Sequence, residues 1–249
     1  MNLFIFVYSI LFIFSAHLPW FYDADNYWDF NDVLNYSIFD IQHARSSRIE
    51  GRHRFVLGPK HDPALEFLPG NLSSHVILGD FTNTCLPNPQ QCHRGFTICF
   101  WVKLRKVLHD GVLFQLSLNR RSRGITVNTV FKNQSVFLNF FVNNATAVHR
   151  INTKFTTNVW HHVEIVWRGT AKQKLAVFVN CSMVGTLKVM DADSSKGMEK
   201  MFVLGANHAG KKATPIAVDD FAIWFKSLDR QRLCQIINEK RGELEVNMK

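Results

Sequence analysis

Alternation of apolar and polar residues dominates the chain from residue 55 onward, and its period of two is that of a β-strand. In segment 96–104 both alternating sets of side chains are largely apolar, which predicts a central strand covered on both faces. Turn-forming pairs such as Asn143-Asn144 separate the periodic segments. The predicted strands are 64–68, 75–79, 96–104, 112–118, 125–131, 136–142, 160–167, 175–180, 183–189, 201–205 and 217–225. Many short strands at near-regular spacing favour an all-β sandwich.

Only the end of the chain has a helical pattern. Asp229 can cap a helix, and Leu233, Ile236 and Ile237 form one apolar stripe. The pair Lys240-Arg241 follows, where cations interact favourably with the helix dipole. The pattern therefore predicts a short C-terminal helix.

The first 16 residues have a different character. Residues 3–14 are apolar except for Ser9, a length that is too short to span a bilayer and that matches the hydrophobic part of a secretory signal. We expect residues 1–16 to be a signal peptide, with Ala16 last before cleavage, and a signal-anchor is the alternative. The chain is then secreted or extracellular, and no later stretch is apolar enough for a second membrane span.

The next segment shows neither period. Residues 17–44 mix aromatic residues with five Asp and contain no Lys or Arg, whereas 45–54 is rich in Arg. The spacing of Arg45 and Arg48 fits either a convertase cleavage site or a solvated linker. We interpret 17–54 as an acidic aromatic arm with a basic linker, 55–241 as the main domain and 242–249 as a tail.

Asparagine sequons agree with secretion. Five occur, and they predict glycosylation at Asn35, Asn71, Asn133, Asn144 and Asn180. The chain also contains five cysteines, an odd number that leaves one thiol outside intramolecular disulfides in an oxidising compartment.

Several segments in a fixed order carry a family resemblance. They are GFTICFWVK at 95–103, WHHVEIVW at 160–167, KLAVFVNCSMVGT at 174–186, FVLG at 202–205 and VDDFAIWFKSL at 218–228. Together they resemble the laminin-G-like, concanavalin A-like jelly-roll superfamily, which includes pentraxins and thrombospondin N-terminal modules. The resemblance extends over residues 60–240. It implies an antiparallel two-sheet jelly-roll sandwich closed by a short C-terminal helix, and it does not specify a ligand.

The resemblance also bears on the cysteines. The family hairpin normally turns on Asn-Gly, but Cys181 replaces the glycine here, as in the thrombospondin N-terminal variety, where this cysteine is bridged. Cys234 on the closing helix is its expected partner. Cys85 and Cys92 flank a short loop that a second disulfide can close. Cys99 is then expected to be a buried thiol.

No cofactor is predicted. The pentraxin calcium site is not expected here, since Lys211 and Lys212 stand where that family places acidic and amide residues, and Ca²⁺ prefers anionic oxygens. Asp219 and Asp220 are either a remaining calcium site or a structural pair at the start of a strand.

The sequence does not favour an enzyme. The E-x-D-x-x-E signature of related glucanases is missing, and Glu164 is a single acid on its strand. His161 and His162 are adjacent, so on a strand they point to opposite faces and cannot chelate one metal together.

The basic charge is the strongest functional signal. Residues 45–249 carry 29 Lys and Arg against 15 Asp and Glu, a net charge of +14. Clusters include Arg52/Arg54 and Lys103/Arg105/Lys106, but the expected ligand-binding residues are those in predicted loops, where binding residues collect. These residues are Arg120, Arg121, Arg123, Lys211 and Lys212.

Sulfated glycosaminoglycans are the abundant extracellular polyanions, and nucleic acid is not an expected partner. A diffuse basic surface that only aids solubility is the alternative. We therefore expect a non-enzymatic extracellular recognition module for a glycan or protein. A calcium-dependent lectin, a glycoside-active enzyme and a structural piece of a larger ectodomain stay open as alternatives.

Overall fold

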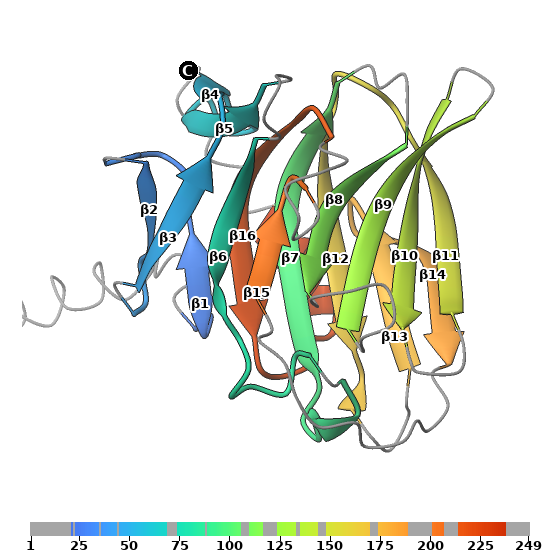
Figure 1. Ribbon diagram of the computed structural model, residues 1–249. Coiled ribbons are helices and arrows are strands. Elements are labelled where there is room, and N and C mark those ends of the chain that lie inside the picture. The colour runs from blue at the N-terminus through green and yellow to red at the C-terminus, as the bar shows by residue number, and fades with distance from the viewer. Residues whose placement is uncertain are drawn as a thin grey trace, which may run out of the picture.

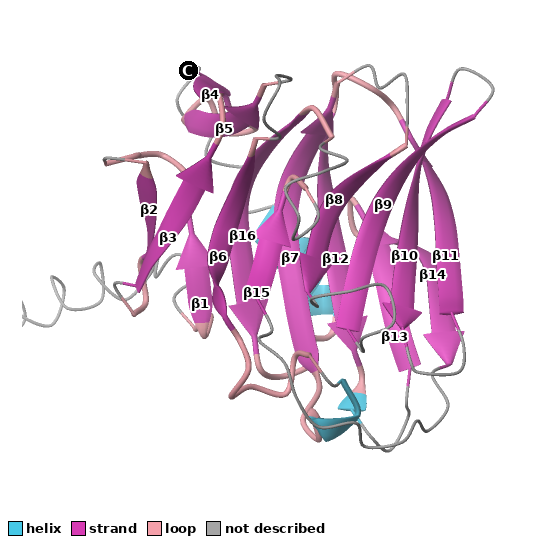
Figure 2. Cartoon of the chain, in the orientation of Figure 1, coloured by secondary structure: helices cyan, strands magenta, loops and turns pink. Residues whose placement is uncertain are grey.

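Two antiparallel sheets of eight strands each pack face to face as a jelly-roll sandwich, shown for the computed structural model in Figure 1 and by type of secondary structure in Figure 2. The structure describes residues 21, 23–34, 36–43, 45–68, 74–87, 89–105, 110–116, 124–132, 135–143, 148–169, 174–188, 201–206 and 214–237. The predicted fold class is confirmed. Within these residues, no helix has the length and apolar character that crossing a membrane requires.

We name the layers sheet A and sheet B. Sheet A contains, in spatial order, β14 (Ser182–Lys188), β13 (Lys174–Val179), β12 (Trp160–Trp167), β7 (Phe96–Leu104), β16 (Ile216–Trp224), β5 (Pro63–Phe67) and β4 (His53–Leu57), and β1 (Asn26–Trp28) pairs with β16. Sheet B contains, in spatial order, β11 (Val148–Phe155), β10 (Ser135–Asn143), β9 (Gly124–Lys132), β8 (Gly111–Leu116), β15 (Met201–Leu204), β6 (His75–Asp80), β3 (Arg45–Glu50) and β2 (Ser37–Asp40).

All eleven predicted strands overlap observed strands, and β7 and β12 have the predicted boundaries. β7 lies between β12 and β16, and eight of its nine residues are buried. The prediction that 96–104 is a central strand covered on both faces is confirmed.

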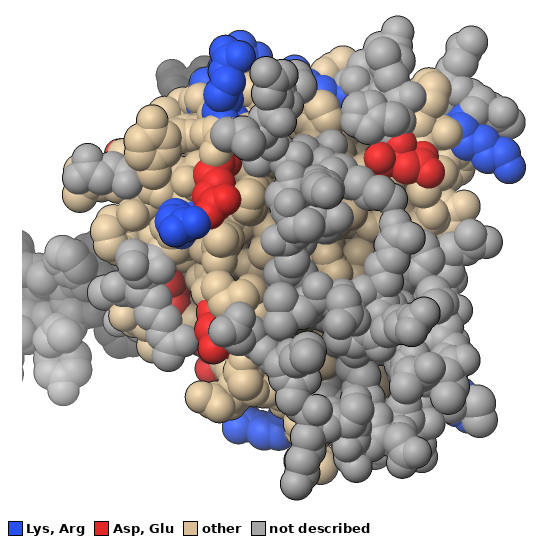
Figure 3. Space-filling model, in the orientation of Figure 1, with Lys and Arg blue, Asp and Glu red and all other residues tan. Residues whose placement is uncertain are grey.

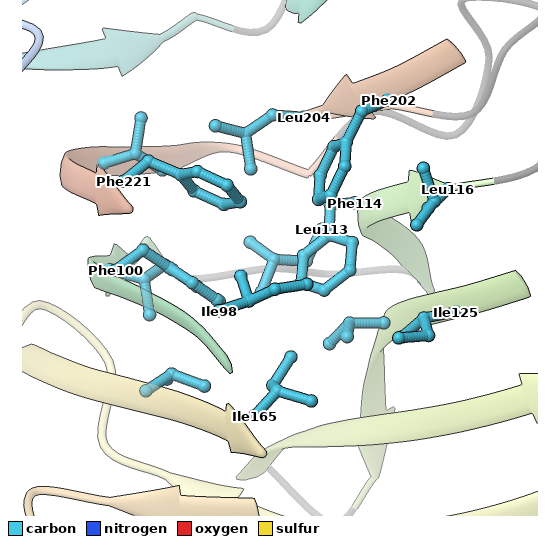
Figure 4. Packing of buried hydrophobic residues seen from close by; sticks show 14 of the residues in the cluster. Ile98, Phe100, Leu113, Phe114, Leu116, Ile125, Ile165, Phe202, Leu204 and Phe221 are labelled. Atoms are coloured by element: carbon cyan, nitrogen blue, oxygen red, sulfur yellow. The ribbon is translucent and has the colours of Figure 1, made fainter. Parts of the chain in front are cut away.

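Aromatic rings from both sheets form the centre of the core. Phe100 of β7 stacks on Phe221 of β16 with ring centroids 5.4 Å apart. Phe114 of β8 and Phe202 of β15 lie 5.2 Å apart and approach from sheet B. Figure 4 shows these rings among branched apolar side chains between the layers. Burial of each large side chain contributes roughly 1.5–3 kcal/mol.

The predicted C-terminal helix is present, and it covers the outer face of sheet A. The described helical residues are 230–237, and Asp229 Oδ1 accepts a hydrogen bond from the Arg232 N–H at 2.8 Å, the geometry of an N-cap. Leu233 and Ile236 pack in a second buried cluster with Tyr27 of β1 and Trp224 of β16.

The predicted arm over 17–54 differs from the structure, because its described residues belong to the sandwich. β1 pairs with β16, and β2 and β3 complete one side of sheet B. The buried Asp40 carboxylate accepts hydrogen bonds from the Tyr27 N–H at 2.9 Å and the Asn26 side chain at 2.6 Å, so an acidic residue joins β1 to β2. The signal peptide predicted at 1–16 and the tail predicted at 242–249 lie outside the described residues.

Both expected disulfides are present. Cys85–Cys92 closes the loop that contains the short 3-10 helix η1 (Pro89–Gln91) between β6 and β7. Cys181–Cys234 joins the turn between β13 and β14 to the C-terminal helix. Cys99 is buried on β7, outside both disulfides, as expected.

Candidate functional site

Strand register gathers charged and aromatic side chains at one end of sheet A. Arg54 of β4 lies opposite Glu66 of β5, and Glu66 lies opposite Ala217 of β16. Ala217 in turn lies opposite Lys103 of β7, and Lys103 opposite Trp160 of β12. One cross-strand row therefore brings together residues more than 100 positions apart in the sequence. With Arg105, which follows β7, the side chains of this row form what we call the Glu66 surface.

Glu66 holds the two arginines of this surface. Its side chain is only 2% exposed, and Arg54 Nε lies 2.5 Å from Oε2 while Arg105 Nε donates to Oε1. Burial alone would raise the pKa of Glu66, but the hydrogen bonds and charges of Arg105 and Arg54 outweigh it and lower the pKa. The carboxylate therefore stays ionised and fixes both guanidinium groups beside each other.

Lys103 adds a third cation. Its Nζ lies 4.6 Å from the centroid of the Trp160 ring, and no carboxylate in the described part of the chain forms an ion pair with it. Partial burial lowers the pKa of Lys103, as does the charge of Arg105, while Glu66 opposes this change. Three cations around one carboxylate leave the surface with a net charge of +2.

The cations face solvent and have an apolar border. The side chains of Arg54 and Arg105 are 58% and 33% exposed. Trp160 Nε1 donates to the Leu57 carbonyl at 3.2 Å, and Leu57 and Val159 are among the most exposed large apolar residues. Guanidinium groups bind carboxylate and sulfate oxygens well, and an aromatic ring packs against the apolar face of a sugar.

A row of buried polar residues follows on the same face. His162 of β12 lies opposite Trp101 of β7, which lies opposite Asp219 of β16. The imidazole of His162 is fully buried and bonds to Glu164, which is also fully buried. The single acid considered for glycoside chemistry is thus sequestered with a partner rather than presented at the surface.

Asp219 and Asp220 sit at an irregularity in the pairing of β16 with β7. Asp220 pairs with Lys60 at 2.9 Å and accepts a hydrogen bond from the Tyr27 hydroxyl, while Asp219 Oδ1 accepts the Asp220 N–H. Burial and the neighbouring Asp220 raise the pKa of Tyr27 well above its ordinary value, so its hydroxyl remains a donor. Among the described residues, no three His, Cys, Asp or Glu are placed to hold a metal.

Arg120, Arg121, Arg123, Lys211 and Lys212 lie outside the described residues, as do the sequon residues Asn35, Asn71, Asn133 and Asn144. Asn180 is described and lies exposed in the turn between β13 and β14. Sequence reasoning noted Arg54, Lys103 and Arg105 as basic clusters but missed that Glu66 joins them. The available signal was an acid within the apolar strand 64–68.

Comparisons with known proteins agree on the fold. A family model described as the concanavalin A-like lectin/glucanases superfamily matches residues 78–234, and among curated proteins none matches the sequence significantly. The chain is similar to the binding domain of botulinum neurotoxin DC in complex with rat synaptotagmin II, with a TM-score of 0.65 and 18% identity, covering 88% of this chain and 52% of that one.

It is also similar to a structure of botulinum neurotoxin type C, whose cell entry is dependent upon interaction with two ganglioside molecules. There the TM-score is 0.65 and the identity 17%, over 88% of this chain and 51% of that one. The chain spans about half the length of these structures, and identities this low show the fold alone. Because the family match covers more than half of the sequence and the sandwich agrees with it, the chain belongs to the concanavalin A-like lectin/glucanases superfamily.

Proposed function

We propose that the protein is a non-enzymatic extracellular binding module whose Glu66 surface binds an anionic glycan. The observation that carries this proposal is the cross-strand row in which one buried carboxylate fixes Arg54 and Arg105 beside Lys103 and Trp160. The expected signal peptide and the two disulfides support an extracellular location.

The chemistry of the surface supports sulfate or carboxylate groups as the recognised feature. Both guanidinium groups use Nε for Glu66, and Arg105 Nη1 lies 3.3 Å from Asn158 Oδ1. The Arg54 side chain is 58% exposed, so an anion in solvent can reach its guanidinium group. Preorganised cations lose little side-chain entropy when they bind an anion. The apolar border of Trp160 and Leu57 suits the C–H face of a sugar ring.

The buried acids support a role without catalysis. Glycoside hydrolysis needs two carboxyl groups that reach one substrate bond. In this chain Glu66 is held by two arginines, and Glu164 is buried with His162. Similar structures include a neurotoxin binding domain in complex with synaptotagmin and a neurotoxin whose entry depends on gangliosides, so this fold serves the recognition of both proteins and glycans.

Salt elution from immobilised heparin tests the proposal. The deglycosylated protein is expected to elute from heparin at a much higher salt concentration than from a cation exchanger of matched charge, because an organised site adds to diffuse attraction. Lys103→Gln removes a cation that forms no ion pair with any residue the structure describes, and it is expected to lower the elution salt concentration. Arg168→Gln, an equal charge loss at the opposite end of β12, is the control and should change elution much less.

Three further arms separate the alternatives. Neutralising Arg120, Arg121 and Arg123 tests whether the predicted loop contributes to heparin binding. Addition of EDTA tests whether binding needs calcium. Sialylated oligosaccharides compared with heparin fragments distinguish carboxylate from sulfate recognition. Equal elution of the wild type from both resins, with no binding to either oligosaccharide class, would contradict the proposal. If the protein still binds cells after the glycans of those cells have been removed, a protein partner, the second candidate, is favoured.

A further inference from the structure

Asn180 has a structural role that conflicts with its sequon. Its backbone N–H donates to the His162 carbonyl at 2.9 Å, and its side-chain Oδ1 accepts the His162 N–H, also at 2.9 Å. The residue thereby adds one more rung to the pairing of β12 with β13, and half of that rung comes from its own carboxamide. The glycan acceptor, Nδ2, lies 3.3 Å from His161 Nδ1. Both polar atoms of the Asn180 carboxamide, which a glycosyltransferase must bind, therefore already contact β12.

The turn itself is held in one conformation. Val179 pairs with Ser182, so Asn180 and Cys181 are the two central residues of a tight hairpin. Their φ angles are 49° and 66°, the left-handed region that two-residue hairpin turns require. Asn tolerates this region better than other residues that carry a side chain. A transferase that must draw the three sequon residues into its own site would have to unpair the hairpin.

The Cys181–Cys234 disulfide prevents this unpairing of the hairpin. Cys181 is the middle residue of the sequon, and its bond to Cys234 ties the turn to the C-terminal helix. Cys234 is synthesised 53 residues later, which at about 5–20 residues per second is a delay of roughly 3–10 s. During at least this interval the sequon is free of the disulfide, and it is locked once the bond to Cys234 forms.

We propose that glycosylation of Asn180 is decided by a race between glycan transfer and formation of the Cys181–Cys234 disulfide, and that the folded, disulfide-bonded protein is no longer a substrate there. This inference rests on the proposed extracellular function, because glycan transfer and disulfide formation both occur in the secretory pathway. Asn180 is exposed in the folded protein, but the extent of its glycosylation depends on the order of folding events and not on this exposure.

Site-resolved mass spectrometry of protein from secretory cells tests the race. We expect occupancy at Asn180 to be lower than at the other sequons in the wild type and to rise severalfold in Cys234→Ser, which keeps the sequon intact. Total cell material is measured, so that a variant retained by quality control is still scored. A brief reducing pulse during synthesis of the wild type gives the same comparison without a mutation.

Controls assign any change to this disulfide. The Cys85→Ser/Cys92→Ser variant removes the other disulfide and should leave Asn180 occupancy unchanged, and Ser182→Ala removes the sequon and gives the zero point. Occupancy at Asn180 equal to that of the other sequons in the wild type would overturn the inference, as would an unchanged low occupancy in Cys234→Ser and under reduction. If no sequon carries a glycan, the secretory location fails, and the proposed extracellular function fails with it.

Discussion

His162 and Glu164 form a buried pair two residues apart on β12, with Nδ1 of the imidazole 2.5 Å from Oε1 of the carboxylate and neither side chain exposed. Trp101 packs against the imidazole at a centroid distance of 4.9 Å. Within the described residues, His162 Nε2 and Glu164 Oε2 have no hydrogen-bond partner. The pair is therefore held by one contact and by the packing around it.

Replacing one member of this pair should lower the free energy of unfolding more than replacing both. His162→Leu leaves a buried carboxylate and is expected to lower the free energy of unfolding by about 3 kcal/mol or more. Glu164→Met leaves a buried imidazole without its partner and should lower the free energy of unfolding by about 1–3 kcal/mol. The double variant is apolar with similar volume and should be more stable than the sum predicts. Urea denaturation of all four proteins measures the coupling, and additive losses would show that the two side chains act independently.

The Glu66 surface predicts a specific acid sensitivity. The pKa of Glu66 is lowered from its ordinary 4.5 in the folded protein, so the carboxylate contributes stability above that pH and loses it as the pH falls through the lowered value. Below pH 4.5, the unfolding free energy of the wild type should fall more steeply than that of Glu66→Gln. Asp32→Asn, which removes an exposed carboxylate elsewhere, is the control. Thermal melts from pH 6 to 3 test this prediction, and parallel curves for wild type and Glu66→Gln would refute it.

Most of the sandwich could be predicted because its central strands bury both faces or alternate strictly. β7 and β12 were predicted with their observed boundaries. β3 was missed because its sequence, Arg45-Ser-Ser-Arg-Ile-Glu, is polar. Its buried Ser47 accepts a hydrogen bond from Trp28 Nε1 and donates to the Leu78 carbonyl. Such internal hydrogen bonds replace apolar burial and leave no periodic signal.

The Glu66 surface could not be predicted for a different reason. Arg54 and Trp160 reach it from opposite sides of a five-strand row, so the site depends on strand order and register rather than on spacing in the sequence. The Cys181–Cys234 disulfide was predictable from the family resemblance, since Cys181 occupies a turn position that is recognisable in the motif, whereas Cys85–Cys92 was predictable from the short loop between the two cysteines. The role of Glu66 required knowledge of which strands lie beside β5.

Close backbone approach at Gly95 predicts a severe effect of a single methyl group. Gly95 precedes β7 with φ +80°, and a Cβ there would lie 2.2 Å from the Trp167 carbonyl oxygen and 2.9 Å from Ser227 Cβ. Because backbone cannot yield easily, Gly95→Ala should lower the unfolding free energy by about 3 kcal/mol or more.

Gly79→Ala is the matched control for this substitution. Gly79 also has a positive φ, but its nearest neighbour to a new Cβ is 4.0 Å away, so only conformational strain of about 1–3 kcal/mol is expected. Denaturant melts of both variants compare the two effects. Equal losses would mean that strain alone, and not the contact with Trp167, sets the requirement for glycine at position 95.

The two disulfides should differ in what they contribute to stability. Cys181–Cys234 spans 53 residues and Cys85–Cys92 spans 7, so in the chain-entropy account their removal lowers the unfolding free energy by about 4 and 2.5 kcal/mol respectively. Loss of the longer one also frees the helix at 230–237, whose Leu233 and Ile236 cover the outer face of sheet A. The Cys181→Ser/Cys234→Ser variant should therefore show increased hydrogen exchange in the helix and in the neighbouring Trp224 segment, while the Cys85→Ser/Cys92→Ser variant should not. If both double variants lose equal stability and exchange alike, the helix is held by its apolar contacts and not by the disulfide.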